Sequence, residues 1–332
     1  MNKSEILQLL RRNTKIPRVS LPRDIDLTIE EGVLKVYINK TTENMQTNSV
    51  AFESWIIMLK SWIGNEIKSV ELDFAVPENL SGHYGTPENG HYNRFLYRLN
   101  HLKRMYPNWF HLKKEKSIIV SEFMNWLESN TVLLNHSLKE RQSVIQTNNM
   151  ERKIESWFVF EEGKKLICDM WGIDPNQLYN QLPIGVFYQE IAAKNAVFTR
   201  GQSAIDLWGI GKQGETLHMI ELKCGDNKGM GVISETLFYA AILHDTCIRK
   251  DEVFQFGTYQ DTPKTRDKIA IQNNGNKFGS LSVHILSEKY HPLFDDKVVS
   301  LIKEGLSNFY INFDRATYDY EGKTIYNETK NL

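Results

Sequence analysis

Apolar and polar residues form recognisable patterns along the first half of the chain. Residues 24–39 hold two alternating stretches around Glu30-Glu31-Gly32, which predicts a β-hairpin. The elements expected after it are a helix at 51–64, a strand at 69–76, a helix at 91–106, a strand at 117–120 and a helix at 121–129. These elements predict a mixed α/β domain over residues 1–148, which ends in the polar stretch 142–149.

A different order of elements follows from residue 149 onward. Residues 151–171 place apolar side chains on a helical stripe. The next expected elements are strands at 185–194, 203–210 and 216–224, a helix at 232–243, a strand at 280–287 and a helix at 295–306. The order α-β-β-β-α-β, with an antiparallel hairpin opening a mixed sheet, predicts a second α/β domain over residues 149–332.

Charged residues occupy matched positions in two of these predicted strands. If the turn between the strands closes with Gln213-Gly214 at its centre, Asp206 and Glu221 are equidistant from it and lie opposite each other. Cβ atoms in such pairs are roughly 4.5–5.5 Å apart, close enough for two carboxylates to bind one cation. Lys223 shares this face of the strand. The apolar neighbours are expected to point into a core on the other face: Ile205, Leu207, Ile220 and Leu222.

Two carboxylates and a lysine suit phosphodiester hydrolysis. Paired carboxylates bind hard cations such as Mg²⁺, which neutralise phosphate charge and acidify a bound water, and an ammonium group can orient that water. The acidic-x-Lys triplet alone is a weak signal, because it recurs elsewhere in the chain. A plain salt bridge of Lys223 with either acid is the competing interpretation. The order of the surrounding elements favours catalysis.

The second half of the chain resembles the PD-(D/E)XK nuclease superfamily, which has the restriction-endonuclease-like fold. The resemblance covers roughly residues 150–290 and rests on SAIDLWGI at 203–210, MIELKCG at 219–225 and the flanking helices. Ile205 replaces the proline of the motif, a departure that leaves the chemistry intact. No family resemblance is found for residues 1–149.

This resemblance implies roles for the central residues. Asp206 and Glu221 would be metal ligands, and the Leu222 carbonyl would be a backbone metal ligand. Lys223 would contact the attacking water. The implied cofactor is Mg²⁺, or Mn²⁺ in its place.

Four further residues are candidates to support the site. The resemblance implies that one glutamate of the first core helix reaches the metal, and Glu155 is that candidate; Glu190, in the first predicted strand, is a rival. Glu235 and Tyr239 share a helical face four residues apart, where related nucleases often carry glutamine and tyrosine. Because glutamate replaces glutamine here, packing or hydrogen bonding beside the site is favoured over contact with DNA. For Glu155 and Glu190 the alternative is a solvated surface acid.

Basic residues offer candidate contacts to nucleic acid. The glycine-rich turn at 225–231 places Lys228 beside the proposed site, where it could meet a phosphate, although such turns often serve geometry alone. The segment 94–116 is rich in Lys and Arg, and helical spacing leaves Arg94 and Arg98 on a flank open to phosphates. Lys103 and Arg104 belong to the same segment. A solvated basic helix face is the alternative.

Composition narrows the class of protein without choosing a function. The formal net charge of -1 gives no overall attraction to polyanions, so nucleic-acid binding must come from local basic clusters. The 3 cysteines lack a CxxC pair, which argues against a disulfide framework or a cysteine zinc site and favours the cytoplasm. No apolar run reaches the length of a signal peptide or a membrane span, so no membrane association is expected.

These inferences lead to one functional hypothesis and one alternative. We expect a cytoplasmic, Mg²⁺-dependent nuclease acting on DNA, in restriction, defence or repair, with RNA left open as substrate. The N-terminal domain would select substrate, bind a partner or dimerise, because a homodimer cuts both strands of a duplex most easily. The alternative is an inactive nucleic-acid-binding or scaffold protein that retains the nuclease fold.

Overall fold

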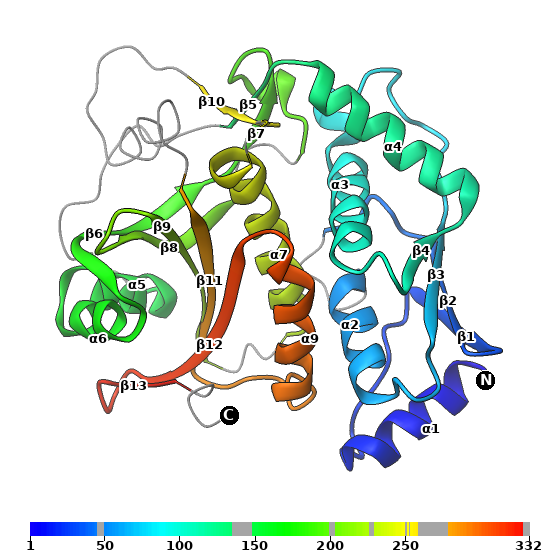
Figure 1. Ribbon diagram of the computed structural model, residues 1–332, viewed down its shortest axis with the longest axis horizontal. Coiled ribbons are helices and arrows are strands. Elements are labelled where there is room, and N and C mark those ends of the chain that lie inside the picture. The colour runs from blue at the N-terminus through cyan, green and yellow to red at the C-terminus, as the bar shows by residue number, and fades with distance from the viewer. Residues whose placement is uncertain are drawn as a thin grey trace.

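We describe the fold from a computed structural model of the chain. The structure describes residues 1–44, 50–134, 148–198, 203–225, 229–249, 251, 253–257 and 278–327. In these residues, helices pack against β-sheets of four, three and six strands, which confirms the predicted α/β class (Figure 1). None of the helices in the described ranges has both the length and the apolar character needed to cross a bilayer.

The N-terminal sheet has the strand order β1-β2-β3-β4. Its strands are β1 (Ile25–Glu30), β2 (Val33–Ile38), β3 (Ser69–Phe74) and β4 (Phe110–Leu112). β1 and β2 form the predicted hairpin, and the turn residues Glu31 and Gly32 have φ angles of 52° and 84°, as a two-residue type I′ turn requires. β3 confirms the predicted strand at 69–76 and runs parallel to both β2 and β4.

The helices that accompany this sheet are α1 (Lys3–Thr14), α2 (Phe52–Trp62), α3 (Gly90–Met105) and α4 (Lys114–Ser129), with the short 3-10 turn η1 (Pro87–Asn89) before α3. α2, α3 and the second half of α4 confirm the predicted helices. The predicted strand at 117–120 is wrong, because these residues lie inside α4. Val120, Phe123 and Leu127 are buried at helical spacing, so the helical period outweighs the β-branched run at 118–120.

The C-terminal sheet has the strand order β13-β12-β11-β9-β8-β6. Its strands are β6 (Ile173–Pro183), β8 (Ala204–Gly211), β9 (Thr216–Lys223), β11 (Ser280–Ser287), β12 (Ile311–Asp319) and β13 (Thr324–Asn327). β8 is antiparallel to β6 and β9, whereas β11 is parallel to β9 and β12. The sheet is therefore mixed, as predicted, and the strands predicted at 203–210, 216–224 and 280–287 are confirmed.

Helices cover both faces of this sheet (Figure 1). α5 (Met150–Phe160) and α6 (Glu162–Trp171) lie on one face, and α7 (Gly231–Leu243) and α9 (Asp296–Ser307) lie on the other. A π-helical turn, η3 (His244–Ile248), continues α7. The continuous helical stripe predicted at 151–171 is thus two helices, because the chain is extended at Glu161 with φ -124° and ψ -156°. The predicted helices at 232–243 and 295–306 are confirmed.

One predicted strand is largely wrong, and a longer one was missed. The segment 185–194 supplies only β7 (Val186–Tyr188), which joins β5 (Val132–Leu134) and β10 (Gln255–Phe256) in a separate sheet, and then the 3-10 turn η2 (Ala193–Asn195). The neighbour of β8 in the main sheet is β6. The run Asp174-Pro175-Asn176 near the start of β6 reads as a turn in sequence, which hides this strand.

A continuous hydrophobic core joins the two halves of the chain. α2 and α3 pack against α7 and α9, and one cluster of buried side chains extends from α1 to β12. Trp62 Nε1 donates to the Leu293 carbonyl at 3.0 Å, and Tyr106 Oη donates to the Leu301 carbonyl at 2.9 Å. Residues 135–147, next to the predicted domain boundary, lie outside the described residues. The division at 148/149 stays a prediction.

Candidate active site

The site lies where two central strands of the C-terminal sheet separate. The β8–β9 ladder runs from Ile210↔Leu217 to Leu207↔Ile220, and the next position in this register places Asp206 opposite Glu221. Beyond the ladder, the Leu222 backbone N–H donates to Asp206 Oδ2 at 2.8 Å. The predicted pairing of these strands is confirmed.

The hairpin has the turn that the sequence predicted. Gly214 has a φ of 78°, and its N–H donates to the Gly211 carbonyl at 2.8 Å. Leu207, Ile220 and Leu222 pack in the core beneath α5 and α6. The prediction that Ile205 shares this core is wrong, because Ile205 packs in the larger cluster on the other side of the sheet. β8 therefore changes the face it presents at Asp206.

Lys223 connects the carboxylates of β9 and α7. Its Nζ lies 2.7 Å from Glu221 Oε1 and 3.2 Å from Glu235 Oε2. The other oxygen of Glu221, Oε2, is buried and has no hydrogen-bond partner among the described residues. One carboxylate oxygen at the site is therefore available to a ligand.

The electrostatics of the site reflect carboxylates removed from water. Asp206 and Glu221 are only 8% and 2% exposed. Burial raises the pKa of Asp206 to about 7, against the opposing effects of Lys223 and the Leu222 N–H. Burial, and then the charge of Asp206, raise the pKa of Glu221 well above its usual range. Although burial opposes it, the attraction of Glu221 and Glu235 raises the pKa of Lys223, which stays protonated.

The two rival supporting glutamates lie in different places. Glu155, on α5, is 3% exposed and accepts a hydrogen bond from Gln181 Nε2 at 3.0 Å. Its negative charge contributes to the raised pKa of Asp206, so the structure brings these two residues together. Glu190 is exposed on the turn after β7, and no contact within the described ranges joins its carboxylate to the site. The expectation that it lies in a strand beside Asp206 is wrong, because β6 occupies that place.

Glu235 and Tyr239 lie beside the site on α7. Tyr239 Oη donates to Glu235 Oε1 at 2.9 Å, while Glu235 Oε2 pairs with Lys223. Both side chains are buried, with exposed fractions of 4% and 2%. These contacts fit the alternative of hydrogen bonding beside the site.

The basic residues of α3 are not the open flank that the sequence predicted. Arg94 and Arg98 are 4% and 5% exposed, because α3 is covered by its own sheet on one side and by α7 on the other. Arg98 Nε donates to Glu53 Oε1 at 2.6 Å in a buried ion pair. Arg94 lies above the Phe238 ring, 5.9 Å from its centroid. A helical pattern cannot show that a second face of α3 is covered by α7.

The remaining basic candidates lie farther along. Lys103 is partly exposed and donates to Ser117 Oγ at 3.0 Å. The Arg104 guanidinium lies 4.9 Å from the centroid of the Phe309 ring and 3.8 Å from Asp245 Oδ1. Lys228 lies outside the described residues.

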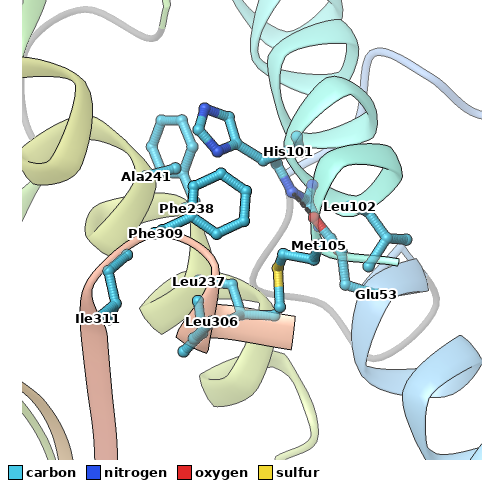
Figure 2. Close-up of a pocket in the computed structure, with 11 residues that line it drawn as sticks. Glu53, His101, Leu102, Met105, Leu237, Phe238, Ala241, Leu306, Phe309 and Ile311 are labelled. Carbon is cyan, nitrogen blue, oxygen red and sulfur yellow. Dashed lines mark hydrogen bonds and ion pairs between the residues drawn. The ribbon is translucent and has the colours of Figure 1, made fainter. Parts of the chain in front are cut away.

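A small cavity lies on another face of α7, away from the carboxylates (Figure 2). Its lining is mostly apolar and includes Met105, Leu237 and Phe309, with Glu53 and His101 as polar members. The cavity volume of ≈ 20 Å³ has room for about one water molecule, which is too little for a small-molecule ligand. The chemistry-bearing residues are therefore those at the β8–β9 fork.

Some polar residues in the interior were not found from the sequence. Gln181 contacts Glu155 from β6, a strand whose pattern gave no signal. Asp245 is fully buried in η3 and accepts hydrogen bonds from Tyr97 Oη at 3.0 Å and from His101 and His244 at 3.0 and 2.8 Å. These partners come from separate helices, so only the tertiary structure reveals the cluster.

The comparisons and the donor set leave the family open. No protein-family model matches the chain, and no curated protein matches it. Within the described residues, no group of three or more His, Cys, Asp or Glu side chains is placed to hold a metal ion. The ligand set expected from the sequence differs in kind, since it joins two carboxylates to one backbone carbonyl. The fold and site define a mixed α/β protein with buried carboxylates and a lysine at the fork of its central sheet.

Proposed function

We propose that this chain is a metal-dependent nuclease with a restriction-endonuclease-like core of the PD-(D/E)XK type, and that DNA is its substrate. The observation that carries the proposal is the meeting of Asp206, Glu221 and Lys223 where β8 and β9 separate. Helices on both faces of a mixed sheet support the same fold. The N-terminal region would select the substrate, bind a partner or form a homodimer.

The residues present fit a divalent cation such as Mg²⁺ or Mn²⁺. Asp206, Glu221 and the Leu222 carbonyl would hold it, since hard cations prefer oxygen ligands. The buried Glu221 Oε2, with no hydrogen-bond partner in the described chain, supports this assignment. When bound, the cation would neutralise phosphate charge and lower the pKa of a water molecule.

The protein's own residues prepare the site for a phosphodiester. The Leu222 N–H fixes one oxygen of Asp206, and Glu221 and Glu235 hold the ammonium of Lys223 between them. Because Lys223 stays protonated, it can donate hydrogen bonds to a water or a phosphate oxygen but cannot act as a base. Lys223 would therefore orient the nucleophile or stabilise developing negative charge.

The alternative, an inactive protein held together by a structural salt bridge, explains less of the arrangement. A Lys223–Glu221 pair would account for one carboxylate. It leaves unexplained why Asp206 and Glu155 are buried beside it, since burying additional like charges destabilises the fold. Three or more acids around one lysine are better accounted for by a cation site.

The test is cleavage of labelled DNA and RNA with Mg²⁺, Mn²⁺ or a chelator. The wild-type protein should cleave DNA only with metal, and Asp206→Asn and Lys223→Ala should each lower the rate at least about a hundredfold. Lys165→Ala is the matched control, because Lys165 forms an exposed surface pair with Asp169. Cleavage of RNA alone would change the substrate.

Metal binding separates catalysis from a structural bridge. Calorimetry with Mn²⁺ and duplex DNA should show weaker binding for Asp206→Asn, which loses a negative ligand. Lys223→Ala should bind Mn²⁺ as tightly as the wild-type protein or more tightly, because it removes a positive charge beside the cation. Absence of metal binding by the wild-type protein, or normal cleavage by Asp206→Asn, would refute the nuclease assignment.

A further inference from the structure

Gln181 has an unusual backbone conformation for a residue inside a strand. Its φ is 53°, in the left-handed region that favours glycine, although it lies within β6. L-residues adopt this region at a cost in free energy, and such residues gather at functional sites. The strand therefore retains a conformation that a glycine would adopt without strain.

The position of Gln181 in the sheet is next to the proposed site. Its neighbours Asn180 and Leu182 pair with Leu207 and Ile205, so Gln181 lies opposite Asp206. Both strands change face here. In β6, Leu178 packs beneath α5 and α6 whereas Leu182 packs in the larger core. The left-handed residue lies where β6 turns over.

The side chain of Gln181 contacts the supporting carboxylate. Its Nε2 donates to Glu155 Oε1 at 3.0 Å, and Glu155 is 3% exposed. A neutral amide holds a carboxylate without cancelling its charge, whereas lysine or arginine would neutralise it. The contact therefore fixes Glu155 and leaves its negative charge available to a cation.

We propose that Gln181 is a positioning residue that aims Glu155 at the cation site formed by Asp206 and Glu221, and that its left-handed backbone is retained for this purpose. The inference rests on the proposed nuclease function. It adds a residue outside the sequence motif, on a strand that the motif does not include. Partners that orient metal-site residues typically contribute about 10–100-fold to metal affinity or activity.

The decisive variant is Gln181→Gly, because it relieves the backbone and removes the amide together. Gln189→Gly is the matched control: Gln189 has a φ of 60°, is exposed after β7, and donates to Tyr188 Oη at 2.9 Å. Both variants should keep or raise the melting temperature, by about 2–4 °C where strain is relieved. Only Gln181→Gly should lower kcat and Mn²⁺ affinity, by about tenfold or more, with KM for DNA little changed.

A second comparison tests whether Gln181 acts through Glu155. If it does, Glu155→Gln should cost far less in the Gln181→Gly background than in the wild-type protein. Gln181→Asn, which tolerates the left-handed region but has a shorter side chain, should lose kcat as Gln181→Gly does.

The outcomes separate this inference from the proposed function. A wild-type protein that neither cleaves nor binds Mn²⁺ removes both proposals. An active wild-type protein whose Gln181→Gly variant keeps its kcat and Mn²⁺ affinity removes this inference alone. A lower melting temperature for Gln181→Gly, with additive losses in the double variant, would assign Gln181 to the fold and also overturn the inference.

Discussion

Asp206 and Glu221 are two carboxylates that the fold removes from water side by side. Without a cation, each raises the proton affinity of the other, and burial adds to this effect. Such a site stabilises a bound cation at the expense of the metal-free fold. At the scale of single residues, function and stability therefore oppose each other here.

The first prediction concerns this opposition and its pH dependence. The pKa of Asp206 is raised to about 7 in the folded protein, above its unfolded value. Its contribution to stability is therefore fully present below about pH 4 and is lost as pH rises through about 7. In a chelator at pH 8, Asp206→Asn should raise the free energy of unfolding by about 1–3 kcal/mol, while at pH 4 it should change little.

Chemical denaturation at both pH values measures this difference. Asp26→Asn, on the exposed face of β1, is the control and should have the same small effect at both pH values. Equal stability of Asp206→Asn and wild-type protein at pH 8 would mean that Asp206 is not held in an unfavourable environment.

The residues at the fork could be found from sequence because their signal is local. Alternation in two strands and one turn placed Asp206 opposite Glu221, and the structure has this register. Arg94 and Arg98 could not be placed, since their burial depends on α7, which lies far along the chain. Gln181 could not be found either, because a left-handed residue inside a strand leaves no mark on the hydrophobic pattern.

At the scale of elements, α7 and α9 belong to both halves of the molecule. The Ser54 hydroxyl on α2 donates to the Met230 carbonyl at 2.8 Å and lies 2.9 Å from Ser234 Oγ on α7. Ser234 Oγ in turn donates to Glu53 Oε2 at 2.8 Å. The start of α7, which carries Glu235 into the site, is thus held by α2. The elements missed from sequence, β6 and the short strands, lack such long apolar faces.

The second prediction tests the close approach of α9 to the N-terminal half. A Cβ at Gly305 would lie 2.7 Å from Cε1 and Cζ of the Tyr106 ring, which is inside van der Waals contact. Gly305→Ala should therefore lower the free energy of unfolding by about 1–3 kcal/mol, although alanine is the better helix former. Ser307→Ala, at the exposed end of the same helix, should change it by less than about 0.5 kcal/mol. A more stable Gly305→Ala protein would show that the helices can separate at no cost.

At the scale of the whole molecule, the shared core determines how the chain unfolds. The third prediction is a single cooperative transition in thermal and denaturant unfolding, with coincident curves from tryptophan fluorescence and circular dichroism. Trp55 and Trp62 report on the N-terminal half, and Trp157 and Trp208 on the C-terminal half. Two separated transitions would show that the predicted domains are independent. A single one would show that the boundary at 148/149 divides the sequence more than the structure.

The shared core also has a consequence for synthesis of the chain. Trp62 on α2 bonds to Leu293, 231 residues farther along, so α2 cannot complete its packing until the segment before α9 has left the ribosome. At roughly 5–20 residues per second, this delay is on the order of 10–50 seconds. During that time the apolar sides of α2 and α3 that later meet α7 and α9 stay open to water and to other chains. Nascent chains of this protein should therefore depend on chaperones that shield apolar helices until translation ends.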